Sequence, residues 1–252
     1  MHPDDWIIIP ARYQASRLPG KPLARIGSKP MICHVLDRAR ETGAEHIVVA
    51  TDDERIQEAV QQEDCRAVLT SEGHESGSDR LAEVVDFLGL PDDAVIINLQ
   101  GDEPMMPPAL LTQVAQLLRE QPDAGIATLM VPIVEHSEFA NPDVVKVVAN
   151  NLGQALYFSR SPIPFHRDRH HGTGEQIDMF GFRHLGLYAY RAGFLRQFVA
   201  MPSPEIERFE KLEQLRALAM GATIAIAVAE QMPPAGVDTQ ADLDRIRTEL
   251  LD

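Results

Sequence analysis

The sequence predicts an α/β fold, with a mostly parallel β-sheet flanked by helices and an antiparallel insertion over residues 143–191. Three observations indicate this class. Short apolar runs alternate with helical patterns along most of the chain. Apolar residues make up 44% and charged residues 24% of the sequence, which is ordinary for a globular protein. No linker rich in Pro, Gly or Ser divides the chain, so we expect residues 1–252 to form a single domain.

Strand-like and helical segments follow one another in a regular order. Apolar runs with the length of a strand cover residues 7–10, 46–51, 67–69, 94–99, 126–131 and 223–228. Apolar residues recur at helical spacing over residues 31–39, 81–88, 110–118 and 243–250. Strands that alternate with helices in this way form βαβ units, whose sheet is mostly parallel.

The alternation breaks in the middle of the chain. Strand-like runs at residues 144–149, 155–158 and 182–191 follow one another without a convincing helical pattern between them, and a polar stretch at 166–175 separates the last two. Consecutive strands without a crossover helix pair in antiparallel fashion. We therefore expect residues 143–191 to be an antiparallel insertion packed on the sheet, not an independent domain.

Charge and cysteine content exclude several classes of partner. The formal net charge is −15, from 38 acidic and 23 basic residues, which argues against nucleic acid as a partner. No segment approaches the ~18 apolar residues of a membrane span, and we find no signal-peptide pattern. Cys33 and Cys65 suit a reducing compartment and form neither a disulfide framework nor a metal cluster. We expect a cytoplasmic protein.

A basic loop contrasts with the acidic chain. Residues 11–29 contain no acidic residue and five basic ones: Arg12, Arg17, Lys21, Arg25 and Lys29. The loop lies between a strand and a helix, where open α/β sheets bind ligands, and its charge favours a phosphate chain. It is no P-loop, because Pro22 follows Gly20-Lys21. A solvated surface loop is the alternative.

Two aspartates follow predicted strands. Asp102 lies in the stretch 100–104, after the strand at 94–99 and at the same sheet edge as the basic loop. A carboxylate beside a polyphosphate is a suitable ligand for Mg²⁺, although an acidic turn before a helix is the alternative. Asp238 lies between the last strand and the last helix. There it or Thr239 is suited to cap the helix, and a capping role and a site role remain equally open.

Other polar groups also allow two readings. The strand at 182–191 places His184, Gly186, Tyr188 and Tyr190 on one face, which could recognise a sugar, face solvent or lie in a dimer interface. Residues 76–80 open a helix whose amides could bind a ligand, but a simple helix cap explains them equally well. The histidines at positions 166, 170 and 171 lack the spacing of metal ligands, so we expect a solvated loop.

Taken together, these stretches resemble the 3-deoxy-manno-octulosonate (Kdo) cytidylyltransferase family of sugar nucleotidyltransferases. The resemblance runs through residues 8–12, 17–23, 50–52, 76–80, 98–104, 157–160, 183–188, 212–216 and 236–239. The most specific stretches are Gln-Gly-Asp-Glu-Pro at 100–104 and Arg-His-Leu-Gly at 183–186. One departure is Ser78-Asp79, where the family pattern is expected to have Thr-Glu; the hydroxyl and the carboxylate are both kept.

The resemblance implies a Rossmann-like nucleotidyltransferase fold, a homodimer, and transfer of CMP from CTP to Kdo with Mg²⁺ as cofactor and diphosphate as product. It implies that Asp102 and Asp238 bind the metal and, with Lys21, form the catalytic set. The implied CTP-binding residues are Ala11, Arg12, Lys21, Ser78 and Arg80. The implied Kdo-binding residues are Arg17, Gln100, Arg160, His184, Tyr188, Glu213 and Gln214. The insertion is then expected to contribute to the sugar site and the dimer interface.

Two alternative functions remain open at this stage. One is a cytidylyltransferase for a related 2-keto acid sugar, such as 8-amino-Kdo or sialic acid. The other is a catalytically silent nucleotidyltransferase-like binding subunit. The presence of both Asp102 and Asp238 beside an intact basic loop argues against the silent subunit.

Overall fold

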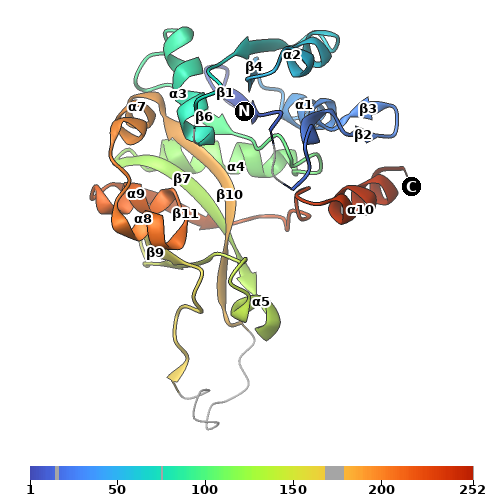
Figure 1. The fold of residues 1–252 in the computed structure, drawn as a ribbon. Helices are drawn as coiled ribbons and strands as arrows, with labels where there is room; N and C mark the ends of the chain where they lie inside the picture. The colour runs from blue at the N-terminus through green and yellow to red at the C-terminus, as the bar shows by residue number, and fades with distance from the viewer. Residues whose placement is uncertain (15–16, 75, 168–178, 252) are drawn as a thin grey trace.

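The structure is a computed structural model that describes residues 1–14, 17–74, 76–167 and 179–251 (Figure 1). Within these residues, a nine-stranded sheet is built on the strand order β11-β7-β10-β6-β1-β4-β5, with β8 attached to β10 and β9 attached to β8. Its strands are β1 (Trp6–Ala11), β4 (His46–Thr51), β5 (Arg66–Leu69), β6 (Val95–Asn98), β7 (Ala124–Ile133), β8 (Lys146–Ala149), β9 (Ala155–Ser159), β10 (Gly181–Arg191) and β11 (Thr223–Val228). The expected α/β class is confirmed.

Helices cover both faces of this sheet. They are α1 (Met31–Arg40), α2 (Glu54–Gln61), α3 (Gly77–Phe87), α4 (Pro108–Glu120), α5 (His136–Ala140), α7 (Ala192–Ala200), α8 (Glu205–Glu210), α9 (Gln214–Ala219) and α10 (Gln240–Leu251). One apolar layer contains side chains of α1, α2 and α4, and the other contains side chains of α3, α7 and α9. No helix in the described part of the chain is both long and apolar enough to cross a membrane.

Strand β1 lies in the interior of the sheet. It pairs in parallel with β4 on one side and β6 on the other. Ile7, Ile8 and Ile9 are fully buried, with Ile7 and Ile9 in one apolar layer and Ile8 in the other. A parallel strand covered on both faces is expected to be a continuous apolar run, and this explains why it could be recognised in the sequence.

The middle segment differs from the expectation of an insertion packed on the sheet. Strand β10 lies inside the sheet, between β6 and β7 and antiparallel to both, and β8 and β9 extend the sheet from it. The long strand passes beyond the main sheet toward α5 (Figure 1). Leu185, Leu187 and Ala189 pack into one apolar layer, while Tyr190 packs into the other, so β10 is covered on both faces. Residues 168–178, including most of the predicted polar stretch and two of the three histidines, lie outside the described residues.

Four short helices, α5, α7, α8 and α9, were not predicted from the sequence. The longest has nine residues, which leaves too few turns for a repeated helical pattern to be recognised. Leu195 and Phe198 of α7 and Leu215 of α9 are buried against the sheet. Tertiary packing therefore stabilises these helices where local pattern does not.

The C-terminal segment returns to the carboxyl edge of the sheet. The amide of Val237 donates a hydrogen bond to the carbonyl of Asp102 at 2.9 Å. Helix α10 lies beside the small hairpin of β2 (Arg25–Ile26) and β3 (Lys29–Pro30), and its Leu243 and Ile246 share an apolar cluster with Ile26. This docking brings Asp238 next to Asp102, far from it in sequence.

Gly101 permits β1 and the turn after β6 to approach each other closely. A Cβ atom at Gly101 would lie 2.8 Å from the carbonyl oxygen of Pro10. Because that neighbour is backbone, it cannot move aside as a flexible side chain would. A residue with a Cβ atom would therefore overlap the backbone at this position.

We expect Gly101→Ala to lower the free energy of unfolding by about 1–3 kcal/mol, because the added methyl group overlaps the Pro10 carbonyl. Gly186→Ala is the matched control, since a Cβ at Gly186 meets nothing within 4 Å. Urea denaturation followed by circular dichroism measures both variants. Equal losses in the two variants would contradict the close backbone approach.

Candidate active site

A pocket of about 270 Å³ opens at the carboxyl edge of β1 and β6. Its walls come from the end of β1, the basic loop, the start of α3, the turn after β6 and the segment before α10. The lining residues are Pro10, Ala11, Arg12, Arg17, Leu18, Lys21, Pro22, His74, Ser76, Gly77, Arg80, Gln100, Gly101, Asp102 and Asp238. The pocket thus gathers the predicted residues Ala11, Arg12, Arg17, Lys21, Arg80, Gln100, Asp102 and Asp238.

Lys21 lies in this pocket in contact with two carboxylates. Its Nζ lies 2.5 Å from Oδ2 of Asp102 and 3.3 Å from Oδ1 of Asp238, and it donates a hydrogen bond to the carbonyl of Val237 at 2.9 Å. Only 13% of the Lys21 side chain is exposed, so solvent screens these contacts little. The two carboxylates therefore converge on one cation position, which the ammonium group occupies.

The same two carboxylates fit a magnesium ion. Mg²⁺ prefers hard oxygen ligands and typically takes one or two protein carboxylates together with substrate phosphates. In the described residues there is no cluster of three or more His, Cys, Asp or Glu side chains placed to hold a metal. Asp102 and Asp238 would thus hold an ion only together with oxygens from a substrate or water.

A third carboxyl, Glu103, lies against this pair and was not singled out in the sequence. Burial raises its pKa to about 8, and the negative charges of Asp102 and Asp238 add to the effect. Its Oε2 is buried and has no hydrogen-bond partner among the described residues. Its place in the acidic stretch 100–104 was the available signal.

The contacts of the last helix resolve the role of Asp238. Thr239 and Asp242 form the reciprocal cap of α10: the amide of Asp242 donates to Oγ1 of Thr239 at 3.3 Å, and the amide of Thr239 donates to Oδ2 of Asp242 at 2.9 Å. The carboxylate of Asp238 instead contacts Lys21 and, at 3.0 Å, the guanidinium of Arg17. The carboxylate of Asp238 therefore belongs to the pocket and takes no part in the cap, to which only the Asp238 amide contributes, with a hydrogen bond of 3.1 Å to Oδ2 of Asp242.

The basic loop divides between the pocket and the surface. Arg12, Arg17 and Lys21 line the pocket. Arg25 donates to the carbonyl of Ser28 at 2.7 Å, and Lys29 forms an ion pair of 3.0 Å with Asp37 of α1. Three of the five cations in this loop therefore line the pocket, and the other two stabilise the loop and the adjoining helix.

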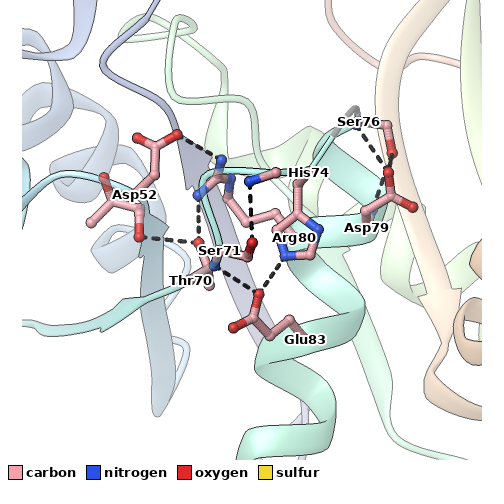
Figure 2. A network of polar contacts seen from close by, with 10 residues as sticks. Asp52, Thr70, Ser71, His74, Ser76, Asp79, Arg80 and Glu83 are labelled. Carbon is pink, nitrogen blue, oxygen red and sulfur yellow. Dashed lines mark hydrogen bonds and ion pairs between the residues drawn. The ribbon is translucent and has the colours of Figure 1, made fainter.

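Figure 2 shows the start of α3 and the arginine behind it. Ser76 and Asp79 form a capping box that fixes the first turn. The guanidinium of Arg80 lies 2.8 Å from Oδ2 of Asp52 and also donates to the hydroxyl of Thr70. These partners follow β4 and β5, so three neighbouring elements hold Arg80 in place. The nearby His74, which contacts Glu83, was not predicted as a site residue.

A second group of predicted residues lies beside the pocket without lining it. His184 of β10 has its Nε2 3.0 Å from the hydroxyl of Thr128, and burial lowers the pKa of His184 to about 3. The centroid of the Tyr188 ring lies 5.3 Å from that of the His184 ring. Burial raises the pKa of Tyr188. The imidazole is therefore neutral at ordinary pH and acts as a hydrogen-bonding group.

Glu213 connects this group to the start of α3. Its Oε2 accepts a hydrogen bond of 3.1 Å from the hydroxyl of Ser78, while its Oε1 is buried without a partner in the described part of the chain. Burial raises the pKa of Glu213. The buried Gln214 follows it at the first position of α9. The unpartnered oxygen is available to accept a hydrogen bond from a substrate hydroxyl.

Arg160, another predicted site residue, contacts residues that do not line the pocket. It follows β9, and its guanidinium donates to the carbonyls of Glu210 at 2.7 Å and Pro142 at 3.0 Å. Oε2 of Glu210 also accepts from the amide of Arg160 at 2.9 Å. The buried ammonium of Lys146 contacts the Arg160 carbonyl. Arg160 is thus held in place by backbone and side-chain contacts and does not line the pocket.

Comparison with known proteins gives a consistent result. Residues 6–224 match the family model described as "Cytidylyltransferase". Relatives named 3-deoxy-manno-octulosonate cytidylyltransferase come from Hahella chejuensis, Nitrosococcus oceani and Halorhodospira halophila, with identities of 54%, 50% and 51%. These alignments cover 96%, 97% and 97% of this chain and 95%, 96% and 96% of the relatives.

Solved structures agree with the relatives. A structure described as CMP:2-keto-3-deoxy-manno-octonic acid synthetase complexed with CTP superposes with a TM-score of 0.89 at 42% identity, covering 98% of both chains. A cytidylyltransferase from Leptospira borgpetersenii has a TM-score of 0.64 at 16% identity, covering 98% of this chain and 86% of the other. The second likeness concerns the fold alone.

The capping contacts predict different stabilities for neighbouring variants. We expect Thr239→Ala to lower the free energy of unfolding by about 1 kcal/mol, because it removes the cap of α10. Asp238→Asn should change it by less than ~0.5 kcal/mol, because its ion pairs are half-exposed and the cap stays intact. Urea denaturation of both variants measures the difference. A loss in Asp238→Asn as large as in Thr239→Ala would make Asp238 part of the cap.

The lowered pKa of His184 predicts a pH-dependent stability. Between the folded pKa of about 3 and the unfolded pKa of ~6.5, the unfolded chain binds more protons, so the free energy of unfolding falls as the pH decreases through this window. We expect His184→Gln to reduce the fall in melting temperature between about pH 7 and about pH 4.5. The control is His2→Gln, a half-exposed histidine, which should keep the wild-type slope. An unchanged slope in His184→Gln would contradict a neutral, buried imidazole.

Proposed function

The chain belongs to the cytidylyltransferase family, and from this premise we propose that it transfers CMP from CTP to Kdo and releases diphosphate. Three relatives that are at least half identical over nearly the whole chain carry that activity in their names. The observation that carries the proposal within this molecule is the convergence of Lys21, Asp102 and Asp238 in one pocket. A silent binding subunit has no need of this charged arrangement, and it is not favoured.

The reaction joins the anomeric hydroxyl of Kdo to the α-phosphorus of CTP while the bond to diphosphate breaks. Such phosphoryl chemistry depends on positioning and on stabilisation of charge more than on covalent work by the protein. Arg12 and Lys21 supply positive charge where the diphosphate leaves. Arg80 and Ser78 at the start of α3, with Ala11 at the end of β1, are the proposed remaining contacts of the nucleotide.

Lys21 has two roles in this proposal. Without substrate, its ammonium lies between the two aspartates and neutralises their repulsion. With CTP bound, Lys21 would contact phosphate oxygens, and Asp102 and Asp238 would be the residues that hold Mg²⁺. Such an ion would supply positive charge that lowers the pKa of the attacking hydroxyl and stabilises the α-phosphate.

We propose that the sugar lies beside β10. Kdo is an acid with several hydroxyl groups, so arginines and hydrogen-bonding side chains are suitable partners. The neutral imidazole of His184, the hydroxyl of Tyr188 and the unpartnered Oε1 of Glu213 are suited to hydroxyl groups. Arg17 and Arg160 are the proposed partners of the carboxylate. Gln100 and Gln214 supply further amides for hydrogen bonds to the sugar.

We further propose a homodimer located in the cytoplasm. Exposed apolar side chains on and near β9 and β11 support an interface there: Leu152 is 71%, Leu156 57% and Val228 47% exposed. This side includes part of the segment 143–191, so the proposed interface and the sugar site would share one segment. The location rests on the free thiols of Cys33 and Cys65, which suit a reducing compartment.

Release of diphosphate from CTP tests the function. The assay compares Kdo, 8-amino-Kdo and sialic acid as acceptors, with ATP in place of CTP as the nucleotide control. We expect the highest kcat/KM with CTP and Kdo. Higher kcat/KM with another sugar would reassign the acceptor, and no release with any acceptor would favour a binding subunit.

We expect Asp102→Asn to reduce kcat by far more than tenfold while leaving the fold intact, because an amide keeps the shape but loses the charge that holds the metal. The matched control is Asp244→Asn on α10, an exposed acid outside the pocket, which should keep wild-type activity. If the variant keeps more than about a tenth of the wild-type rate at saturating Mg²⁺, its activation barrier has risen by less than ~1.4 kcal/mol. That result would contradict the metal role.

A further inference from the structure

The turn after β4 has no part in the proposed function. Asp52 follows Thr51, the last residue of β4, and belongs to the stretch 50–52 that contributes to the family resemblance. The helix that follows is capped by Asp53, whose side chain accepts a hydrogen bond from the amide of Arg55 at 2.9 Å. Helix α2 is therefore capped without the carboxylate of Asp52, which is left for contacts elsewhere.

The two oxygens of Asp52 contact two different walls of the pocket. Oδ1 accepts a hydrogen bond of 3.1 Å from the amide of Tyr13, the residue after Arg12 at the start of the basic loop. Oδ2 accepts one of 2.8 Å from the guanidinium of Arg80 near the start of α3 (Figure 2). Arg12 and Arg80 both line the pocket, whereas Asp52 does not. One carboxylate therefore joins the basic loop to α3.

Burial makes the contact between Asp52 and Arg80 strong. Their side chains are 12% and 4% exposed, so water screens the two charges little. The guanidinium also donates to the hydroxyl of Thr70, which is neutral and itself donates to the carbonyl of Thr51 at 3.0 Å. Among the described residues, Asp52 is the only acidic side chain that forms an ion pair with Arg80. Loss of its charge would leave a buried cation without a counter-ion, which is strongly unfavourable.

The ring of Tyr13 is held by residues that follow Asp52 in the sequence. The guanidinium carbon of Arg55 lies 3.6 Å from the centroid of this ring, which is a cation–π contact. Asp53 fixes Arg55 by accepting hydrogen bonds of 2.9 Å from its Nε and 2.6 Å from its Nη2. The two adjacent aspartates thus hold Tyr13 at its amide and, through Arg55, at its ring.

Tyr13 also contacts the second half of the basic loop. Its carbonyl accepts a hydrogen bond of 3.0 Å from the amide of Gly20. Its ring lies against Gly20, because a Cβ atom there would be 3.2 Å from the ring atoms Cε2 and Cζ. Gly20 precedes Lys21, which lines the pocket. The position of Tyr13 therefore affects both Arg12 before it and Lys21 after Gly20.

We propose that Asp52 is a positioning residue that fixes the basic loop and Arg80 at the separation that CTP requires. The proposal rests on the proposed function, which assigns Arg12, Lys21 and Arg80 to the nucleotide. Asp52 acts through these residues and contacts no substrate itself. Because its two hydrogen bonds hold both walls of the pocket before CTP arrives, less conformational freedom is lost when CTP binds.

Asp52→Asn tests this role by steady-state kinetics with both substrates. Its oxygen can still accept from the Tyr13 amide, but its NH₂ group then faces Arg80 and cannot accept from it. We expect KM for CTP to rise by roughly ten- to hundredfold, the effect of one hydrogen bond to a charged group. KM for Kdo should rise by less than about threefold, because the basic loop, which carries Arg17, keeps its contact. A merely structural role would lower kcat by reducing the fraction of active protein and leave both KM values unchanged, and that result overturns the proposal.

Asp86→Asn is the matched control, because it breaks another aspartate–arginine pair on the same helix. Asp86 lies near the other end of α3, 2.7 Å from the guanidinium of Arg196, and its side chain is 65% exposed. Neither residue lines the pocket. This variant should keep both KM values at the wild-type level.

Arg80→Gln, alone and combined with Asp52→Asn, keeps the test independent of folding. The double variant contains no unpaired buried arginine, so it should fold even if Asp52→Asn alone does not. Because Asp52 acts through Arg80, adding Asp52→Asn to Arg80→Gln should change KM for CTP by less than about twofold. A further rise of about tenfold or more would overturn the proposal. An unchanged KM for CTP in an active Asp52→Asn enzyme overturns this inference alone, whereas no diphosphate release by the wild-type protein overturns the proposed function as well.

Discussion

The ammonium of Lys21 between the carboxylates of Asp102 and Asp238 is the interaction on which the site depends. Without a cation between them, the two carboxylates would repel each other. The hydrogen bond from Val237 to Asp102 and the close approach of Gly101 to Pro10 bring these residues together from distant parts of the sequence. The fold thus builds a cation position before any substrate arrives.

Two arginines, Arg80 and Arg160, are held in place by other side chains before any substrate binds. Asp52 and Thr70 hold Arg80, and Glu210 holds Arg160. Each arginine is fixed by partners on neighbouring strands or helices, so little conformational freedom remains to be lost when a phosphate or carboxylate binds. The elements that flank the sheet therefore fix the positions of these two arginines.

The sequence predicted the parts of the fold and site that have a local signal. The buried strand β1, the basic loop after it and Asp102 after β6 could all be recognised from short patterns. The position of β10 could not, because alternation reports the two faces of a strand but not its neighbours in the sheet. The role of Asp238 was equally undecidable, since a cap and a ligand have the same local sequence and differ only in contacts made at long range. The partner of Lys29 could not be predicted either, because its charge lies in the basic loop in sequence but pairs with Asp37 of α1 in space.

The most direct test of the central claim is a crystal structure with Mn²⁺ and a non-hydrolysable CTP analogue. We expect an anomalous peak between Asp102 and Asp238, with Nζ of Lys21 moved from both carboxylates to the phosphate oxygens. Anomalous scattering identifies the metal independently of the side-chain positions. A metal bound elsewhere, while Lys21 keeps its contacts with both aspartates, would contradict the account.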